Sequence, residues 1–162
     1  MVAAVARRLQ RPRSVLNFPL TPRVEAAILG ASGKLLAGSA MVAVRYIVHN
    51  VDSAVTFYRE RFGFKLEQQF GAAMAIMEHG ELRLWLAGPG ASASRPMPDG
   101  RKPEAGGWNR FVIELDDLES KVAELRQAGV KFRNDIVAGP GGKQILCEDP
   151  SGNVVELFQP GG

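Results

Sequence analysis

The stretch Val44-Arg45-Tyr46-Ile47-Val48, followed by Asn50-Val51-Asp52-Ser53-Ala54-Val55-Thr56-Phe57-Tyr58, decides the fold. Its first part predicts a β-strand, and its second part predicts an amphipathic helix that begins at an Asn or Asp cap. The same pattern returns at Phe111-Val112-Ile113-Glu114-Leu115, followed by Asp117 through Leu125. Such a repeat indicates two similar modules, and a cleft between them is the natural place for a ligand.

Three further strands are predicted after each helix. The turn signals place them at about 64–70, 73–79 and 82–86 in the first module, and at about 131–137, 143–147 and 154–159 in the second. The order is therefore βαβββ twice, in modules of about 42–87 and 109–160. The Gly- and Pro-rich residues 87–108 between them are predicted to be either a module linker or a flap over the cleft.

Charge is distributed unevenly along the 162 residues, whose formal net charge is +3. Six of the 20 Lys and Arg, but only one of the 17 Asp and Glu, lie in residues 1–40. The remaining 14 basic and 16 acidic residues make 41–162 slightly acidic. A basic surface for nucleic acid is therefore not expected in this single domain, and no apolar run is long enough to span a membrane.

The basic residues 1–40 are expected to form a disordered extension outside the folded domain 41–162. Their composition also fits a transit peptide, which would send the protein to an organelle. A third interpretation is an upstream start placed before a domain that begins at Met41, and the position of Met41 just before the first strand favours it. On that interpretation the expected location is cytoplasmic.

The one cysteine and the two histidines are not predicted to form a catalytic or metal site. Cys147 is the only cysteine, which excludes an intrachain disulfide, and its apolar neighbours predict a buried packing thiol. His49 and His79 stand at strand ends and are predicted to be solvated or locally hydrogen-bonded.

The repeated unit and one further motif resemble a known family. Glu148-Asp149-Pro150-Ser151-Gly152-Asn153-Val154-Val155-Glu156-Leu157, together with residues 115–118, is similar to the vicinal oxygen chelate superfamily. That superfamily includes glyoxalase I, extradiol dioxygenases, and bleomycin- and fosfomycin-resistance proteins. The resemblance covers about 42–160 and implies an α+β fold in which paired βαβββ modules form a curved, mixed-sheet half-barrel cleft. It also implies a homodimer.

Metal-dependent members of this superfamily carry four ligands at corresponding strand positions. Carried over to this sequence, those positions fall on Ala43, Trp85, Arg110 and Glu156. Only Glu156 can coordinate a divalent ion, and the Arg110 cation would repel one. Neither a divalent metal nor another cofactor is therefore expected.

Strand alternation predicts which side chains face the cleft. The candidate ligand-binding residues are Arg110, Trp85, Arg45, Arg83, Glu114 and Phe158. One interpretation is structural: Arg110 pairs with Glu156 or Glu114 and fills the former metal site. The other is that Arg forks and the Trp85 face bind a planar or anionic molecule. Glu156 is a candidate catalytic base, although a neighbouring arginine would keep it ionised.

Three functions remain open from the sequence. The first is a protein that binds a small anionic or aromatic molecule in a metal-free cleft, without nucleic-acid or membrane partners. The second is a lyase, isomerase or dioxygenase of the same superfamily that acts on a small carbonyl or aromatic compound. The third is an interaction module whose cleft is filled and non-functional.

Overall fold

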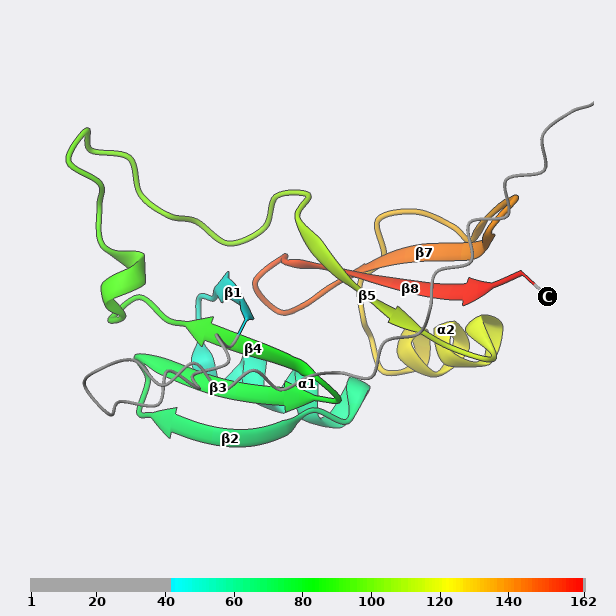
Figure 1. The fold of residues 1–162 in the computed structure, drawn as a ribbon, viewed down its shortest axis with the longest axis horizontal. Coiled ribbons are helices and arrows are strands. Elements are labelled where there is room, and N and C mark those ends of the chain that lie inside the picture. The colour runs from blue at the N-terminus through cyan, green and yellow to red at the C-terminus, as the bar shows by residue number, and fades with distance from the viewer. Residues whose placement is uncertain (1–41, 162) are drawn as a thin grey trace, which may run out of the picture. The chain divides into compact units, whose positions relative to one another are not determined.

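The repeated pattern produces two βαβββ modules, and the computed structural model describes them over residues 42–161 (Figure 1). The first module contains β1 (Ala43–Ile47), α1 (Val51–Phe62), β2 (Lys65–Phe70), β3 (Met74–His79) and β4 (Leu82–Ala87). The second contains β5 (Arg110–Glu114), α2 (Leu118–Gln127), β6 (Val137–Gly139), β7 (Gly142–Glu148) and β8 (Val154–Pro160). The expectation for residues 1–40 lies outside the described residues.

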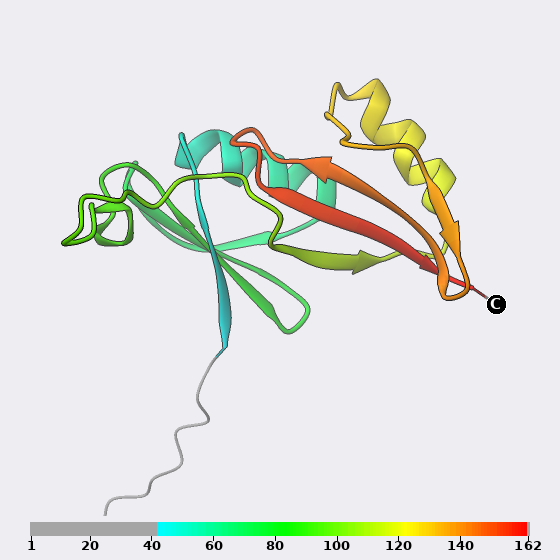
Figure 2. The same cartoon turned by 90° about the horizontal axis from the view of Figure 1, so that it is seen from above.

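Each module forms its own four-stranded sheet. The strand orders are β1-β4-β3-β2 and β5-β8-β7-β6. The β1–β4 and β5–β8 pairs are parallel, whereas the other neighbours are antiparallel, so both sheets are mixed. In Figure 2 α1 lies against the first sheet and α2 against the second. The predicted α+β class with paired βαβββ modules is confirmed.

Both helices begin at the side-chain caps that the sequence indicated. The Asn50 side chain accepts a hydrogen bond from the Ser53 amide at 2.8 Å, and Asp117 accepts one from the Ser120 amide at 2.9 Å. Gly63 ends α1 in the left-handed region, at φ 69°, where a residue with a Cβ would be strained. None of the helices within residues 42–161 is long and apolar enough to cross a membrane.

One hydrophobic core joins the two modules. The Phe111 ring on β5 packs 5.7 Å from Tyr46, 6.2 Å from Tyr58 and 5.9 Å from Phe64, centroid to centroid. These three partners belong to the first module, so the second module contributes an aromatic ring to the core of the first. Cys147 is fully buried, as predicted, and burial raises the pKa of its thiol to about 12.

The predicted strand at 131–137 is largely wrong. Strand β6 covers only Val137–Gly139, and before it a single bridge joins Phe132 to Cys147. The Asn134 side chain, rather than a backbone carbonyl, accepts the hydrogen bond from the Leu146 amide at 2.9 Å. Two backbone hydrogen bonds flank the bridge, from Arg133 N to Leu146 O and from Glu148 N to Lys131 O, but the pairing stops at Asn134, where the side chain takes the place of the backbone carbonyl.

Candidate functional site

The turn between β7 and β8 contains a buried carboxylate that binds both modules. Asp149 is 5% exposed and accepts hydrogen bonds from the Ser151 and Asn153 amides at 2.8 and 2.9 Å. It also accepts from the Asn153 side chain at 2.9 Å and from the Tyr58 hydroxyl of α1 at 3.0 Å. The turn is therefore fixed both internally and against the first module.

Asn153 extends this network to β1 and to the linker, residues 88–109. Its side-chain amide donates to the Ile47 carbonyl at 2.9 Å, and its side-chain oxygen accepts from the Gly106 amide at 2.9 Å. Arg133 holds the same part of the linker, because it donates to the Gly107 carbonyl at 2.6 Å and to the Gly152 carbonyl at 3.0 Å. The end of the linker is thus held beside β1 and the turn.

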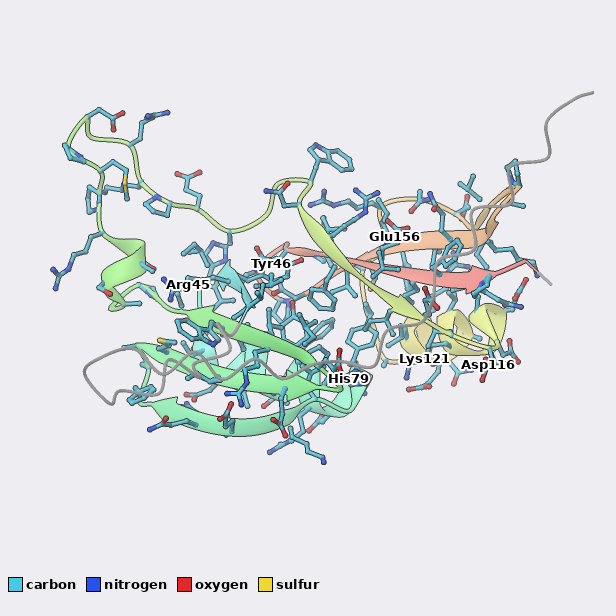
Figure 3. The ribbon with its side chains drawn as sticks, viewed as in Figure 1. Arg45, Tyr46, His79, Asp116, Lys121 and Glu156 are labelled. Atoms are coloured by element: carbon cyan, nitrogen blue, oxygen red, sulfur yellow. The ribbon has the colours of Figure 1, made fainter. Side chains whose placement is uncertain are left out.

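A cavity of about 460 Å³ lies where these segments meet. It is lined by residues of β1, by the end of the linker, by the start of β5 and by Asn153. Two cations, Arg45 and Arg110, and one anion, Glu104, are among its lining residues. Figure 3 places Arg45 and Tyr46 on β1 and Glu156 on β8. The structure therefore brings together two of the predicted ligand-binding arginines.

The Arg45 guanidinium stacks on the Trp85 ring. Its central carbon lies 4.8 Å from the ring centroid, and β1 and β4 align the two residues directly. No described ion pair involves Arg45, so its guanidinium edge keeps its capacity to bind an anion. The buried Trp85 Nε1 has no hydrogen-bond partner among residues 42–161.

Arg110 and Glu156 form the ion pair that one interpretation of the sequence predicted. Arg110 Nε donates to Glu156 Oε2 at 2.5 Å, and Glu156 is only 8% exposed. Arg110 also donates to the Trp108 carbonyl at 3.2 Å through Nη1. The Glu156 carboxylate is therefore already engaged by a cation.

Tyr46 is one of the lining residues, but its hydroxyl is committed to a bond with the second module. It donates a hydrogen bond to the Val154 carbonyl at 2.7 Å, across the module boundary. Burial raises the pKa of Tyr46 to about 12. At neutral pH the group is therefore protonated and does not serve as a base.

The other predicted ligand-binding residues do not line this cavity. Arg83 pairs with Glu67 of β2 at 2.6 Å. Trp85 lies under the Arg45 guanidinium but is not a lining residue, whereas Glu114 and Phe158 lie at the far end of the β5–β8 pair. Both histidines are exposed, as predicted.

The four positions inherited by resemblance do not fit a divalent ion. Ala43 and Trp85 offer no ligand atom, and the Glu156 carboxylate is bound by the Arg110 guanidinium. Within residues 42–161 no group of three His, Cys, Asp or Glu side chains is placed to hold a metal ion.

Sequence reasoning missed Glu104, Asn109 and Asn153 as parts of the cavity. Glu104 and Asn109 lie in the linker, whose path has no periodic signal. Asn153 does carry a signal, because it ends the turn motif at 149–153 that the sequence singled out. Its role depends on bonds to Ile47 and Gly106, which are far from it in the sequence.

Comparison with known proteins agrees with this architecture. Residues 40–157 match the sequence model of the Glyoxalase/Bleomycin resistance protein/Dioxygenase superfamily. Among solved structures, TnmS3, an antibiotic-binding protein from Streptomyces sp. CB03234, is 26% identical, with a TM-score of 0.58 over 78% of this chain and 99% of that one. A search of the curated proteins found no match.

Two further solved structures share the fold at lower identity. Lactoylglutathione lyase from Agrobacterium tumefaciens is 23% identical, with a TM-score of 0.59 over 76% of this chain and 95% of that one. The fosfomycin resistance protein FosX from Listeria monocytogenes is 13% identical, with a TM-score of 0.58 over 76% of this chain and 92% of that one.

Proposed function

The chain belongs to the Glyoxalase/Bleomycin resistance protein/Dioxygenase superfamily, and within it we propose that it binds a small anionic or aromatic molecule without a divalent metal ion. The observation that carries the proposal is the pair Arg45 and Arg110, which line one cavity of about 460 Å³. That volume suits a small organic molecule.

The chemistry of the lining residues favours an anion with a planar part. Arg45 offers a guanidinium fork that matches a carboxylate or phosphate, and no described ion pair occupies it. Arg110 is already neutralised by Glu156, so it contributes hydrogen-bond donors more than net charge. Asn109 supplies a polar amide, and Glu104 supplies an acceptor for a hydroxyl or amine of the ligand.

One of the similar structures supports a binding role. TnmS3 is described as an antibiotic-binding protein, so this fold can serve ligand binding itself. In the present chain three of the four inherited metal positions lack a ligand atom that a divalent ion could use.

A thermal-shift screen of small aromatic and aliphatic carboxylates and phosphates tests the proposal. We expect at least one compound to raise the Tm of the wild-type protein by several degrees, because a ligand that binds only the folded state stabilises it. Arg45→Gln should abolish most of that shift. Arg83→Gln is the matched control, because it removes the same charge from a residue that pairs with Glu67 and does not line the cavity, and it should preserve the shift.

Two outcomes would contradict the proposal. One is that no compound in the screen stabilises the wild-type protein. The other is that Arg45→Gln and Arg83→Gln lose the shift equally, since that would indicate non-specific charge effects.

We further propose that the protein forms a homodimer. Apolar side chains are exposed on edge strands: Leu66 (41%) and Phe70 (50%) on β2, and Val112 (51%) on β5. Open sheet edges with such side chains are surfaces that proteins usually cover. Light scattering after size exclusion should give twice the chain mass of 17.5 kDa, and a monomer at micromolar concentration would contradict the proposal.

A further inference from the structure

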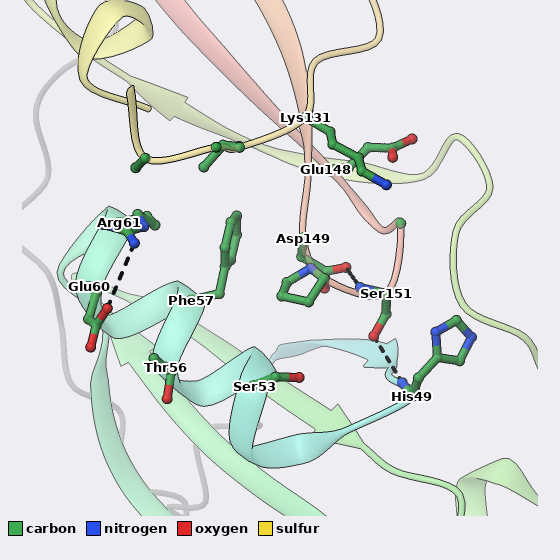
Figure 4. A pocket seen from close by; sticks show the side chains of 15 residues that line it. His49, Ser53, Thr56, Phe57, Glu60, Arg61, Lys131, Glu148, Asp149 and Ser151 are labelled. Carbon is green, nitrogen blue, oxygen red and sulfur yellow. Dashed lines mark hydrogen bonds and ion pairs between the residues drawn. The ribbon is translucent and has the colours of Figure 1, made fainter. Parts of the chain in front are cut away.

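A second cavity, of about 510 Å³, lies between α1 and the second module (Figure 4). One wall is the exposed face of α1, from Ser53 to Arg61. The opposite wall is the segment 128–131 after α2, and the turn 148–152 closes one side. It shares no lining residue with the cavity that contains Arg45 and Arg110.

The middle of this second cavity is apolar. Phe57 is half-buried, and Figure 4 shows its ring rising from α1 into the space below segment 128–131. Edge-to-face contacts with Tyr58 and Phe62, at centroid distances of 5.2 and 5.5 Å, hold the ring in this position. Val130 and Pro150 also line the cavity. A flat apolar group can therefore stack or pack against Phe57 without displacing a polar contact.

The charges around the cavity leave one cation uncommitted. Glu148 is bound by Arg133 at 2.6 Å, and the Asp149 carboxylate accepts the bonds of the turn. Glu60 lies 3.9 Å from Arg61 and 3.8 Å from Arg59. Lys131, by contrast, has no ion-pair partner among the described residues. The Lys131 ammonium is therefore the lining cation that an anion can meet without displacing an existing ion pair.

From these observations we propose that the second cavity binds a small aryl anion, with its ring against Phe57 and its carboxylate or phosphate at Lys131. Thr56 and His49 are also among the lining residues. Because the two cavities have no residue in common, the inference does not depend on binding at Arg45.

Phenyl phosphate, benzoate and inorganic phosphate are the probes, titrated into the full chain and followed by amide chemical shifts. We expect phenyl phosphate to shift the amides of residues 53–61 and 129–131. Inorganic phosphate should bind roughly fivefold more weakly, because it lacks the ring contact with Phe57. A benzoate affinity equal to that of phenyl phosphate would assign the site to aryl anions in general, whereas a much weaker one would assign it to aryl phosphates.

Lys131→Gln should weaken phenyl phosphate binding about five- to tenfold, as expected for loss of one charged hydrogen bond. Lys65→Gln is the matched control, because Lys65 is also an exposed lysine and stands on β2, outside the cavity. Arg45→Gln should leave this binding unchanged, which separates it from the proposed function. Unshifted amides in both segments, or equal losses in Lys131→Gln and Lys65→Gln, would overturn the inference.

Discussion

Replacing Asp149 with alanine is expected to lower the free energy of unfolding by at least about 3 kcal/mol. The side chain is 5% exposed and accepts four hydrogen bonds. They come from the backbone amides of Ser151 and Asn153, the side-chain amide of Asn153 and the Tyr58 hydroxyl. Its loss leaves these donors buried without an acceptor, and each costs more than a normal hydrogen bond contributes. Urea denaturation measures the change directly.

Asp135→Ala is the control for this measurement. The Asp135 side chain is 98% exposed and forms one long ion pair, 3.4 Å, with Arg126. Its removal should change stability by no more than about 0.5 kcal/mol. If Asp149→Ala lowers the free energy of unfolding no more than Asp135→Ala does, the hydrogen bonds of Asp149 do not hold the turn against the first module.

Replacing Arg110 with methionine is expected to cost about 2–3 kcal/mol, because it leaves the Glu156 carboxylate nearly buried without its cation. Glu156 is 8% exposed. The Arg110 side chain is 34% exposed, so solvent screens part of the interaction and the lower end of that range applies.

A double mutant separates the lost ion pair from lost packing. Glu156→Gln in the Arg110→Met background removes the unpaired charge and should recover at least about 1 kcal/mol. Arg101→Met, at a side chain that is 85% exposed and paired with Asp99, should cost about 0.5 kcal/mol or less. If Glu156→Gln recovers no stability, Arg110 does not stabilise the fold by neutralising the buried Glu156 carboxylate.

The sequence predicted the modules because their signals are local. The caps Asn50 and Asp117, and the helical spacing of buried residues such as Val51 and Tyr58, fixed α1 and α2 to within a residue or two. The prediction of a strand at 131–137 failed because the side chains of Arg133 and Asn134 contact β7 and the linker. Periodicity does not reveal such contacts.

The candidate site was only partly predictable, for a different physical reason. Alternation placed Arg45, Arg83 and Arg110 on strand faces, but it could not show which cations already have partners. Arg83 binds Glu67 on the edge strand β2, two strands away in the sheet, whereas Arg45 stacks on Trp85 and has no described ion pair. Glu104 and Asn109 flank the linker residues Gly106 and Gly107, which Asn153 and Arg133 bind, and the local sequence carries no signal of those bonds.

The position of a bound ligand tests the central claim most directly. A crystal structure with the anion that stabilises the protein most should show the charged group within about 3 Å of the Arg45 guanidinium, in the cavity shared with Arg110. The claim would be contradicted if the ligand were bound only outside this cavity, with Arg45 still stacked on Trp85.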